Sequence, residues 1–415
     1  MHEDTLSTVA VIGLGHTGLP MAVEYAKAGH QVTAFDINRA LIQQLDNGVS
    51  HIKDVDSTDL AYEDLYFTSD ADLLMGSNVF IVCVPTSLNG DNQANLSNVI
   101  DAIDLINASA GDGAVVILQS TVPVGITREL RGRIQADVAM GYCPERINPG
   151  SKAWGIRNTP RLVSSIDRSW LNLIIATLSP VCAQLRAVSS VETAELAKLW
   201  ENTFRAVNIA AVHELQSIAS KYQIKAADVI DAAATKPYGF MRFNPGAGPG
   251  GDCIPTDPWM LLEDARPGEL DGSIIHAALS SNRDRPWKVA QTAKAILRTT
   301  AWTRNIDHTN VLVLGMSYKP GVNDTRNSPG MVIAAELMSQ GITVDYCDPI
   351  IAEVIINQEK LTRVKWSHVP HGHYDLIIMA NTDGEWCGSP EGFTLGDTIL
   401  DPHGILQGDN IYGVN

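Results

Sequence analysis

The chain has 415 residues, which suggests two or three domains at roughly 150 residues each. Hydrophobic residues make up 45% and charged residues 19%, so wholesale disorder is excluded. The net charge of −17 argues against binding to nucleic acid or to an anionic membrane surface. No signal peptide opens the chain and no apolar run approaches the ~20 residues of a membrane span, so we expect no membrane insertion. Six cysteines without CxxC or metal-ligand spacing predict reduced thiols in the cytoplasm and no bound metal.

The first patterned segment predicts a dinucleotide site. A buried strand over 9–12 runs into Gly13-Leu-Gly15-His-Thr-Gly18, and a helix over 19–28 and a strand over 31–35 follow, ending at Asp36. Such glycines allow a tight turn and let a pyrophosphate approach the backbone at the positive end of the helix. A carboxylate at Asp36 would bind the ribose hydroxyls and repel a 2′-phosphate, which favours NAD over NADP. The alternative is a glycine turn without a ligand.

Further strands are expected over 79–84 and 114–118, since both are apolar on both faces, as parallel strands covered by helices are. The first ~180 residues therefore predict a doubly wound α/β domain.

A long helix is predicted over 191–221, preceded by capping-box spacing at Ser189 and Glu192. Lys198, Asn202 and Arg205 lie on one face of it, where they would polarise a substrate oxygen, although spacing alone favours a solvated helix face. About 45 Å of helix suits a spine between domains and a subunit interface. Its apolar stripe recurs at steps of three and four: Ala197, Trp200, Phe204, Val207, Ala211, Leu215 and Ile218.

Residues 236–258 are so rich in Gly and Pro that neither helix nor strand is expected there, and an ordered loop of this length is more often functional than filler. Cys253 follows Gly250-Gly251-Asp252, and Asp257 lies four residues on. The thiol would be a nucleophile beside a carboxylate that moves protons. The equally weighted alternative is a small buried cysteine.

Helical sequence resumes through about Leu297, and a second α/β unit follows with strands over 311–315, up to Asp348, 376–380 and 398–400. Lys319 and Arg326 flank the loop after its first strand. They predict a clamp on a second phosphate group, or else ordinary surface charges.

Six motifs occur in one order along the chain: Gly13–Pro20, Ser120–Gly125, Cys143–Gly150, Ala194–Arg205, Gly250–Asp257 and Gly315–Arg326. Together they resemble the UDP-glucose/GDP-mannose dehydrogenase family over essentially the whole chain. The segments 201–208 and 231–240 most resemble its UDP-N-acetylglucosamine 6-dehydrogenase branch. The resemblance implies two Rossmann-like domains joined by a long central helix and a helical middle domain. It implies an NAD-binding domain over 1–185, a central domain over 186–300 and a UDP-binding domain over 301–415.

That resemblance also implies a reaction, namely two NAD-dependent oxidations of the C6 alcohol of a UDP-sugar to a uronic acid, as in polysaccharide biosynthesis. Cys253 would form a thiohemiacetal and then a thioester, and a homodimer would form through the long helix. Catalytic roles fall on Cys253, Lys198, Asn202, Asp257, Glu145 and Thr121. NAD contacts fall on Gly13, Gly15, His16, Thr17, Gly18, Asp36, Val84, Pro85, Thr86, Ser120, Thr121 and Arg326. Substrate contacts fall on Glu145, Arg146, Ile147, Asn148, Lys198, Asn202, Arg205, Phe243, Gly246, Gly250, Tyr318 and Lys319.

Four departures from the family pattern leave the sugar open. Asp252 replaces a usual His, Thr256 a Lys of the glucose branch, and His213 a usual Asn; a partner arginine has only Arg242 or Lys236 as counterparts. UDP-N-acetylmannosamine and UDP-glucose are therefore alternative substrates. A two-electron dehydrogenase of the β-hydroxyacid type and a nucleotide-sugar binder without chemistry are the remoter alternatives.

Overall fold

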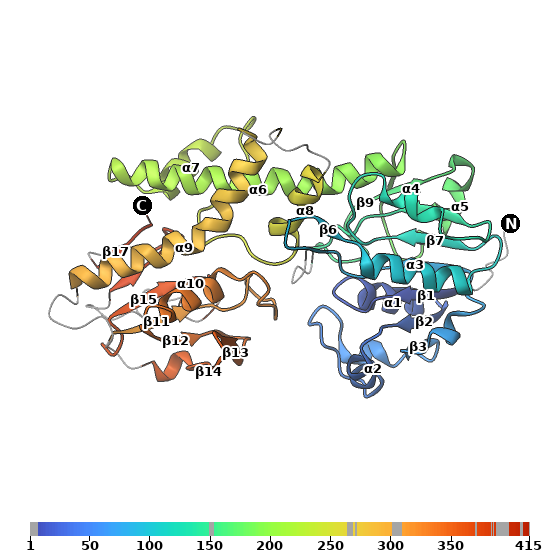
Figure 1. Cartoon of the computed structure of the whole chain (residues 1–415), viewed down its shortest axis with the longest axis horizontal. Coiled ribbons are helices and arrows are strands. Elements are labelled where there is room, and N and C mark those ends of the chain that lie inside the picture. Colours follow the sequence, from blue (N-terminus) through green and yellow to red (C-terminus); the bar gives the residue numbers. More distant parts are fainter. Residues whose placement is uncertain are drawn as a thin grey trace. The chain divides into compact units, whose positions relative to one another are not determined.

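The computed structural model describes residues 7–148, 153–263, 269, 272–300, 309–369, 372–382, 384, 386, 398–406 and 410–414 (Figure 1). They form two compact units, Met1–Glu201 with Trp259–Asp264, and Asn202–Pro258 with Ala265–Asn415. The three-domain division stays a prediction. The predicted start of the third domain, over 301–308, lies outside the described residues. So does the end of the third family motif, at Pro149 and Gly150.

The N-terminal unit is built on one twisted sheet in the order β10-β9-β8-β7-β4-β1-β2-β3, parallel except where β8 pairs with β9. The strands are β1 Thr8–Ile12, β2 Gln31–Phe35, β3 Leu65–Thr68, β4 Val79–Val82, β7 Val115–Leu118, β8 Ala139–Tyr142, β9 Arg161–Ser165 and β10 Leu185–Ala187. The helices are α1 Gly18–Lys27, α2 Arg39–Asp46, α3 Ser97–Ser109, α4 Ile126–Arg131 and α5 Leu171–Leu178. A small hairpin joins β5 Ser87–Leu88 to β6 Ala94–Asn95.

The predicted doubly wound domain is confirmed. Strands β4 and β7 are buried along their whole length, as expected for strands covered on both faces. Alternate residues of β1 enter different cores, Val9 and Val11 on one side and Ala10 and Ile12 on the other. The strand order reverses between β1 and β4, which is where sheets of this kind open a binding crevice.

Helix α6 spans Val191–Lys221, as predicted, but the expected position of its cap was wrong. Its cap is Ser190, whose Oγ accepts the Thr193 N–H at 3.2 Å, so the predicted capping box at Ser189 is one residue early. The apolar stripe points outward in the single chain, since Trp200 is 54% and Ile218 49% exposed. The buried side of the helix combines small and aliphatic residues such as Leu199 and Ala206 with six polar ones: Glu195, Lys198, Asn202, Thr203, His213 and Gln216.

Residues 236–252 are irregular as expected, but helix α8 begins at Cys253 and runs to Leu262. The expectation of no helix up to 258 was therefore wrong. Pro255 lies in the first turn, where a missing N–H costs nothing because no helical acceptor faces it. Pro258 lies inside the helix and removes one bond there. Helices α7 Ala226–Ala234 and α9 Ile274–Thr300 flank this region.

The C-terminal unit contains the second predicted parallel sheet, in the order β12-β11-β15-β16-β17. Its strands are β11 Asn310–Leu314, β12 Thr343–Cys347, β15 Leu376–Met379, β16 Ile399–Leu400 and β17 Ile411–Tyr412. Helix α10 spans Pro329–Met338, and β13 Glu353–Ile356 pairs with β14 Glu359–Thr362 in a hairpin. Nowhere in the described ranges is a helix both long and apolar enough to cross a bilayer.

Candidate functional site

The three glycines of the turn after β1 differ in their structural role: the fold requires Gly13 and Gly18 but not Gly15. Gly13 has a φ of +90°, and a Cβ on Gly18 would lie 1.7 Å from the Gly13 carbonyl oxygen. A Cβ on Gly15 would meet no protein atom within 4 Å. The open space beside Gly15 suits a pyrophosphate that approaches the backbone at the start of α1.

Other predicted cofactor residues gather at the same edge of the sheet, where β1, β2, β4 and β7 end. The Asp36 carboxylate accepts the Leu14 N–H at 2.9 Å and retains lone pairs for ribose hydroxyls. A Cβ on Gly13 would touch Val84 at 3.0 Å, so the turns after β1 and β4 lie together. Ser120 Oγ donates to the Val84 carbonyl at 2.7 Å. The structure thus brings the predicted NAD residues of the N-terminal unit to one edge, and this edge fits a dinucleotide.

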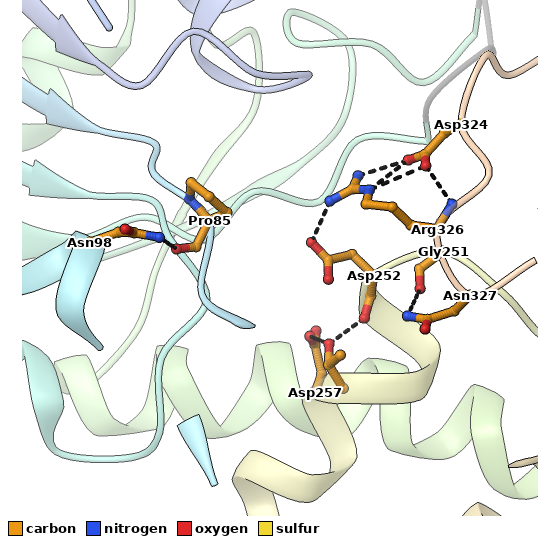
Figure 2. A network of polar contacts seen from close by, with 9 residues as sticks. Pro85, Asn98, Gly251, Asp252, Asp257, Asp324, Arg326 and Asn327 are labelled. Atoms are coloured by element: carbon orange, nitrogen blue, oxygen red, sulfur yellow. Dashed lines mark hydrogen bonds and ion pairs between the residues drawn. The ribbon is translucent and has the colours of Figure 1, made fainter. Parts of the chain in front are cut away.

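Asn98 closes this edge from α3, because its amide donates to the Pro85 carbonyl at 3.1 Å (Figure 2). Sequence reasoning missed Asn98. Nearby, His51 has a pKa that is lowered by burial and then by His16. Thr86 and Thr17 complete the set, Thr17 at the N-cap position of α1.

Lys198 and Glu145 form an ion pair in the N-terminal unit, with Nζ 3.7 Å from Oε2 and side chains 5% and 18% exposed. Glu145 also accepts the Ile147 N–H. The solvated-face alternative is thus wrong for Lys198 and for Asn202, which is also buried, while Arg205 is exposed. A buried ammonium beside a carboxylate can stabilise an oxyanion and exchange a proton.

Two other predicted substrate residues of this unit already serve the fold. Arg146 pairs with Glu201 at 2.7 Å and donates to the Pro160 carbonyl at 2.7 Å. The Asn148 N–H donates to the Trp154 carbonyl at 3.0 Å. Thr121, after β7, is partly buried.

In the C-terminal unit, Asn202 of α6 and Asp257 of α8 are joined by a 2.6 Å hydrogen bond from Nδ2 to Oδ2. Arg205 donates to Asn202 Oδ1 at 3.2 Å. Asp257 is 3% exposed and stands one turn after Cys253, on the same face of α8. This arrangement places an amide, a carboxylate and a thiol on two adjacent helix segments.

The cysteines differ in burial. Cys253 is partly exposed, whereas Cys143, Cys182 and Cys347 are buried. Burial raises the pKa of Cys143 and of Cys83 to about 12, which makes those thiols inert at neutral pH. Position at a helix N-terminus favours a thiolate, and Cys253 is the first residue of α8.

The turn before Cys253 lies tightly against the loop after β11. The Gly251 N–H donates to the Arg326 carbonyl at 2.9 Å. Asn327 Nδ2 donates back to the Gly251 carbonyl at 2.9 Å, and this second bond is drawn in Figure 2. A Cβ on Gly251 would lie 2.7 Å from the Tyr318 ring, and one on Gly250 would lie 2.7 Å from the Asn327 carbonyl oxygen. Both glycines are therefore required by close packing of two loops.

Charged groups reinforce that junction. Arg326 donates to Asp324 and, at 2.8 Å, to Asp252, so it is no ordinary surface charge (Figure 2). Asp324 and then Asp252 raise the pKa of Arg326, and burial with Asp324 raises that of Tyr318 to about 12. Lys319 follows Tyr318 and is partly exposed.

A buried cluster that sequence reasoning missed anchors the loop at Gly246. His213 Nε2 accepts the Gly246 N–H at 3.2 Å, and Arg285 Nε donates to the Gly246 carbonyl at 3.0 Å. Gln216 accepts from Arg285 and donates to the Pro402 carbonyl at 3.0 Å. Burial and the Arg285 charge lower the pKa of His213 to about 3. The i, i+3 spacing of His213 and Gln216 on α6 was the available signal.

The remaining predicted loop residues lie near this cluster or on the surface. The Phe243 ring packs edge-on against that of Phe204, with centroids 6.2 Å apart. Arg242 is paired with Asp231 within the chain, and Lys236 lies 4.8 Å from the centre of the Tyr238 ring.

Three comparisons with known proteins point to one family. Residues 7–174 match the NAD binding domain of the UDP-glucose/GDP-mannose dehydrogenase family, residues 192–284 its central domain, and residues 312–388 its UDP binding domain. The chain is 35% identical to a UDP-N-acetyl-D-glucosamine 6-dehydrogenase of Pseudomonas aeruginosa over 391 residues, 91% of each chain. It is 32% identical to a UDP-N-acetyl-D-mannosamine dehydrogenase of Pyrococcus horikoshii over 85% of this chain and 86% of that one.

Among solved structures, the UDP-D-ManNAc dehydrogenase from Pyrococcus horikoshii superimposes with a TM-score of 0.85 at 28% identity, covering 98% of this chain and 99% of the other. A UDP-glucose dehydrogenase from Pyrobaculum islandicum has the same fold, with a TM-score of 0.85 at 22% identity over 100% of this chain and 98% of that one. NAD is therefore the cofactor of this chain. The chain belongs to the UDP-glucose/GDP-mannose dehydrogenase family and is an NAD-dependent oxidoreductase.

Proposed function

We propose that this enzyme oxidises the C6 alcohol of UDP-N-acetylglucosamine to the uronic acid in two steps, with Cys253 as the nucleophile. The observation that carries the proposal is the trio on α6 and α8: a partly exposed thiol at a helix start, a buried carboxylate one turn on, and an amide bonded to that carboxylate at 2.6 Å. The P. aeruginosa relative, 35% identical, supports this sugar.

When bound, NAD accepts the hydride from C6, once in each step. In the first step the C6 hydroxyl proton passes to a base of the protein and the alcohol becomes an aldehyde. The Cys253 thiolate then adds to the aldehyde carbon and gives a thiohemiacetal. Removal of a second hydride leaves a thioester, and water releases the acid and the thiol. The covalent bond prevents loss of the aldehyde between the steps.

The buried polar residues would supply charge and proton transfer. Lys198 and Asn202, one turn apart on α6, would stabilise the oxyanion that develops on C6. Asp257 would hold the hydrolytic water and take its proton. Glu145, already beside Lys198, would serve as the proton carrier of the alcohol step, with Thr121 assisting.

The binding roles follow the family domains. Gly13 to Gly18, Asp36, Val84 to Thr86 and Ser120 would hold NAD, and open space at Gly15 supports this assignment. Tyr318 and Lys319 would bind the uridine diphosphate, which the UDP binding domain match supports. The substrate loop would present Phe243, Gly246 and Gly250. We propose domains over 1–185, 186–300 and 301–415 for NAD, catalysis and UDP.

A screen of purified nucleotide sugars for NADH formation tests the substrate. We expect UDP-N-acetylglucosamine to give about two NADH per sugar, while the Pyrococcus horikoshii relative keeps UDP-N-acetylmannosamine as the next candidate. One NADH per turnover, or none with tight UDP-sugar binding, would refute the four-electron reaction.

The variant Cys253→Ala tests the nucleophile. Acid product should vanish, whereas Cys347→Ala, which removes a buried thiol from β12, should retain acid formation. An unchanged yield of uronic acid from Cys253→Ala would exclude the thioester route.

We also propose a homodimer formed through the outward face of α6. Trp200, Phe204, Ile218 and the neighbouring Tyr222 are 54%, 38%, 49% and 72% exposed, a patch that a second copy would cover. In sedimentation experiments, a Trp200→Glu, Ile218→Glu double variant should shift to monomer. Tyr66→Glu, which alters an exposed aromatic of β3, should leave the oligomer intact. A monomeric parent protein would refute the proposal.

A cytoplasmic location is the last part of the proposal. None of the five cysteines in the described part of the chain is in a disulfide, which suits a reducing compartment. Recovery of the native protein in the periplasmic or culture fraction would contradict it.

A further inference from the structure

Asp252 stands directly before the proposed nucleophile, where a negative charge should oppose formation of the Cys253 thiolate. An enzyme that uses this thiol at neutral pH needs that charge to be compensated. The compensation has to come from groups within a few ångströms, because exposed charges beyond about 8–10 Å are screened at physiological salt.

The loop after β11 supplies such a group. Arg326 Nη1 lies 2.8 Å from Asp252 Oδ2, and the same guanidinium binds Asp324 with Nε and Nη2 at 3.0 and 2.7 Å from Oδ2. Asp324 is nearly buried, with 9% of its side chain exposed, and its Oδ1 accepts the Arg326 N–H at 2.9 Å. Arg326 is thus fixed by Asp324 and presents its remaining edge to Asp252, as Figure 2 shows.

The backbone around Asp252 is held to the same loop. Two main-chain groups of Gly251 bond to Arg326 and Asn327, both at 2.9 Å, and the Tyr318 ring leaves no room for a side chain at 251. Thr256 Oγ1 donates to the Asp252 carbonyl, so a hydrogen bond within α8 also holds the start of the helix. The ion pair therefore acts on a turn whose direction is already defined.

We propose that Asp252 is a positioning residue for Cys253: paired with Arg326, it ties the first turn of α8 to the loop at 318–327, and Arg326 offsets part of its charge at the thiol. The proposal rests on the proposed role of Cys253 as nucleophile. The charged or titratable groups that face this turn are Asp252 and Asp257 on its own segment, Tyr318, Asp324 and Arg326 on the loop, and Arg205 on α6.

Alkylation of the full-length protein measures the charge compensation without substrate. The rate at which iodoacetamide labels Cys253 at pH 7, followed on its peptide by mass spectrometry, reports the thiolate fraction. Arg326→Gln leaves Asp252 uncompensated and should slow labelling about fivefold, and Asp252→Asn leaves Arg326 in place and should speed it about fivefold. The double variant should return to within about twofold of the parent rate.

Two further variants are controls that distinguish a loss of charge compensation from misfolding. Arg326→Lys retains the charge and should label at nearly the parent rate, and Lys360→Gln, which breaks an exposed ion pair with Glu353 on the hairpin, should change nothing. Equal labelling rates in Asp252→Asn, Arg326→Gln and the parent protein would overturn the proposal.

The positioning role has its own measurement. Asp252→Asn should lower kcat for NADH formation by about tenfold with little change in KM for the UDP-sugar, despite its more reactive thiol. A kcat that rises with the labelling rate would overturn positioning. If Cys253→Ala still forms acid while the labelling cycle holds, the proposed function fails and the Asp252–Arg326 coupling stands.

Discussion

Acidification should expose the energetic cost of burying His213. The side chain is 5% exposed, and burial together with Arg285 lowers its pKa to about 3, against about 6.5 in an unfolded chain. Between these two pH values only the unfolded chain binds the proton. The free energy of unfolding is therefore undiminished by His213 above pH 6.5 and decreases as the pH falls toward 3. Within this range each pH unit lowers the free energy of unfolding by about 1.4 kcal/mol. At pH 4.5 the penalty from this residue is about 3 kcal/mol.

The variant His213→Asn removes this proton site and keeps an oxygen that can accept the Gly246 N–H. Urea unfolding between pH 7 and 4.5, followed by circular dichroism, should show that the variant loses about 3 kcal/mol less stability than the parent over this range. Gln216→Leu is the control in the same cluster, because it should destabilise equally at every pH. The same pH slope in parent and His213→Asn, or a His213 ring signal that titrates near pH 6.5 by NMR, would refute the reasoning.

Two other substitutions probe single contacts. Glu195→Ala leaves three donors unpaired, the N–H of residue 125 and both donors of Thr127, and should lower the free energy of unfolding in urea by roughly 3 kcal/mol. The control Glu192→Gln, at an exposed ion pair, should lower it by under about 1 kcal/mol. Similar losses in the two variants would contradict the structural role of the buried carboxylate. Gly251→Ala places a Cβ 2.7 Å from the Tyr318 ring at a φ of +79°. NADH formation should therefore fall by about 100-fold or more, while the circular dichroism spectrum stays unchanged. Full activity would refute the close packing of the turn before Cys253 against the loop after β11.

Local patterns were enough to predict the elements whose periodicity is strong. The strand–turn–helix–strand start was predicted to within one or two residues, because β1 and β2 are bounded by glycine or Asp36 and α1 follows a glycine turn. Both ends of α6 were predicted for a similar reason, since no Gly or Pro interrupts Val191–Lys221. Helix α8 is not predicted from the sequence, because Pro255 and Pro258 indicate a helix break unless their positions within the helix are known.

The face of α6 that is buried was not predictable from its own sequence. Asn202 bonds to Asp257, 55 residues away, and His213 bonds to the backbone of Gly246, 33 residues away. Arg285 reaches Gln216 across 69 positions. Partners at such separations leave no periodic trace, so the i, i+3 spacing of His213 and Gln216 on α6 could not show which residues they bind. Local spacing did single out Lys198, Asn202, Cys253 and Asp257 as candidates, but it left the alternative of a solvated face or a buried cysteine open. Glu145 and Thr121 enter only through the family resemblance.

The exposed apolar stripe and the buried polar residues of α6 have a consequence for protein engineering. Standard stabilisation replaces exposed aromatics with charged residues and buried polar groups with aliphatic ones. Applied to this helix, the first rule would replace Trp200 and Ile218, and the second would replace Lys198 and Asn202. A redesign guided by solubility and core packing alone would therefore remove the proposed partner surface and the proposed catalytic groups, and it would leave Glu145 and Asp257 without a partner that each has now. Stabilisation of this enzyme should be directed at other surfaces, and α6 should be kept unchanged.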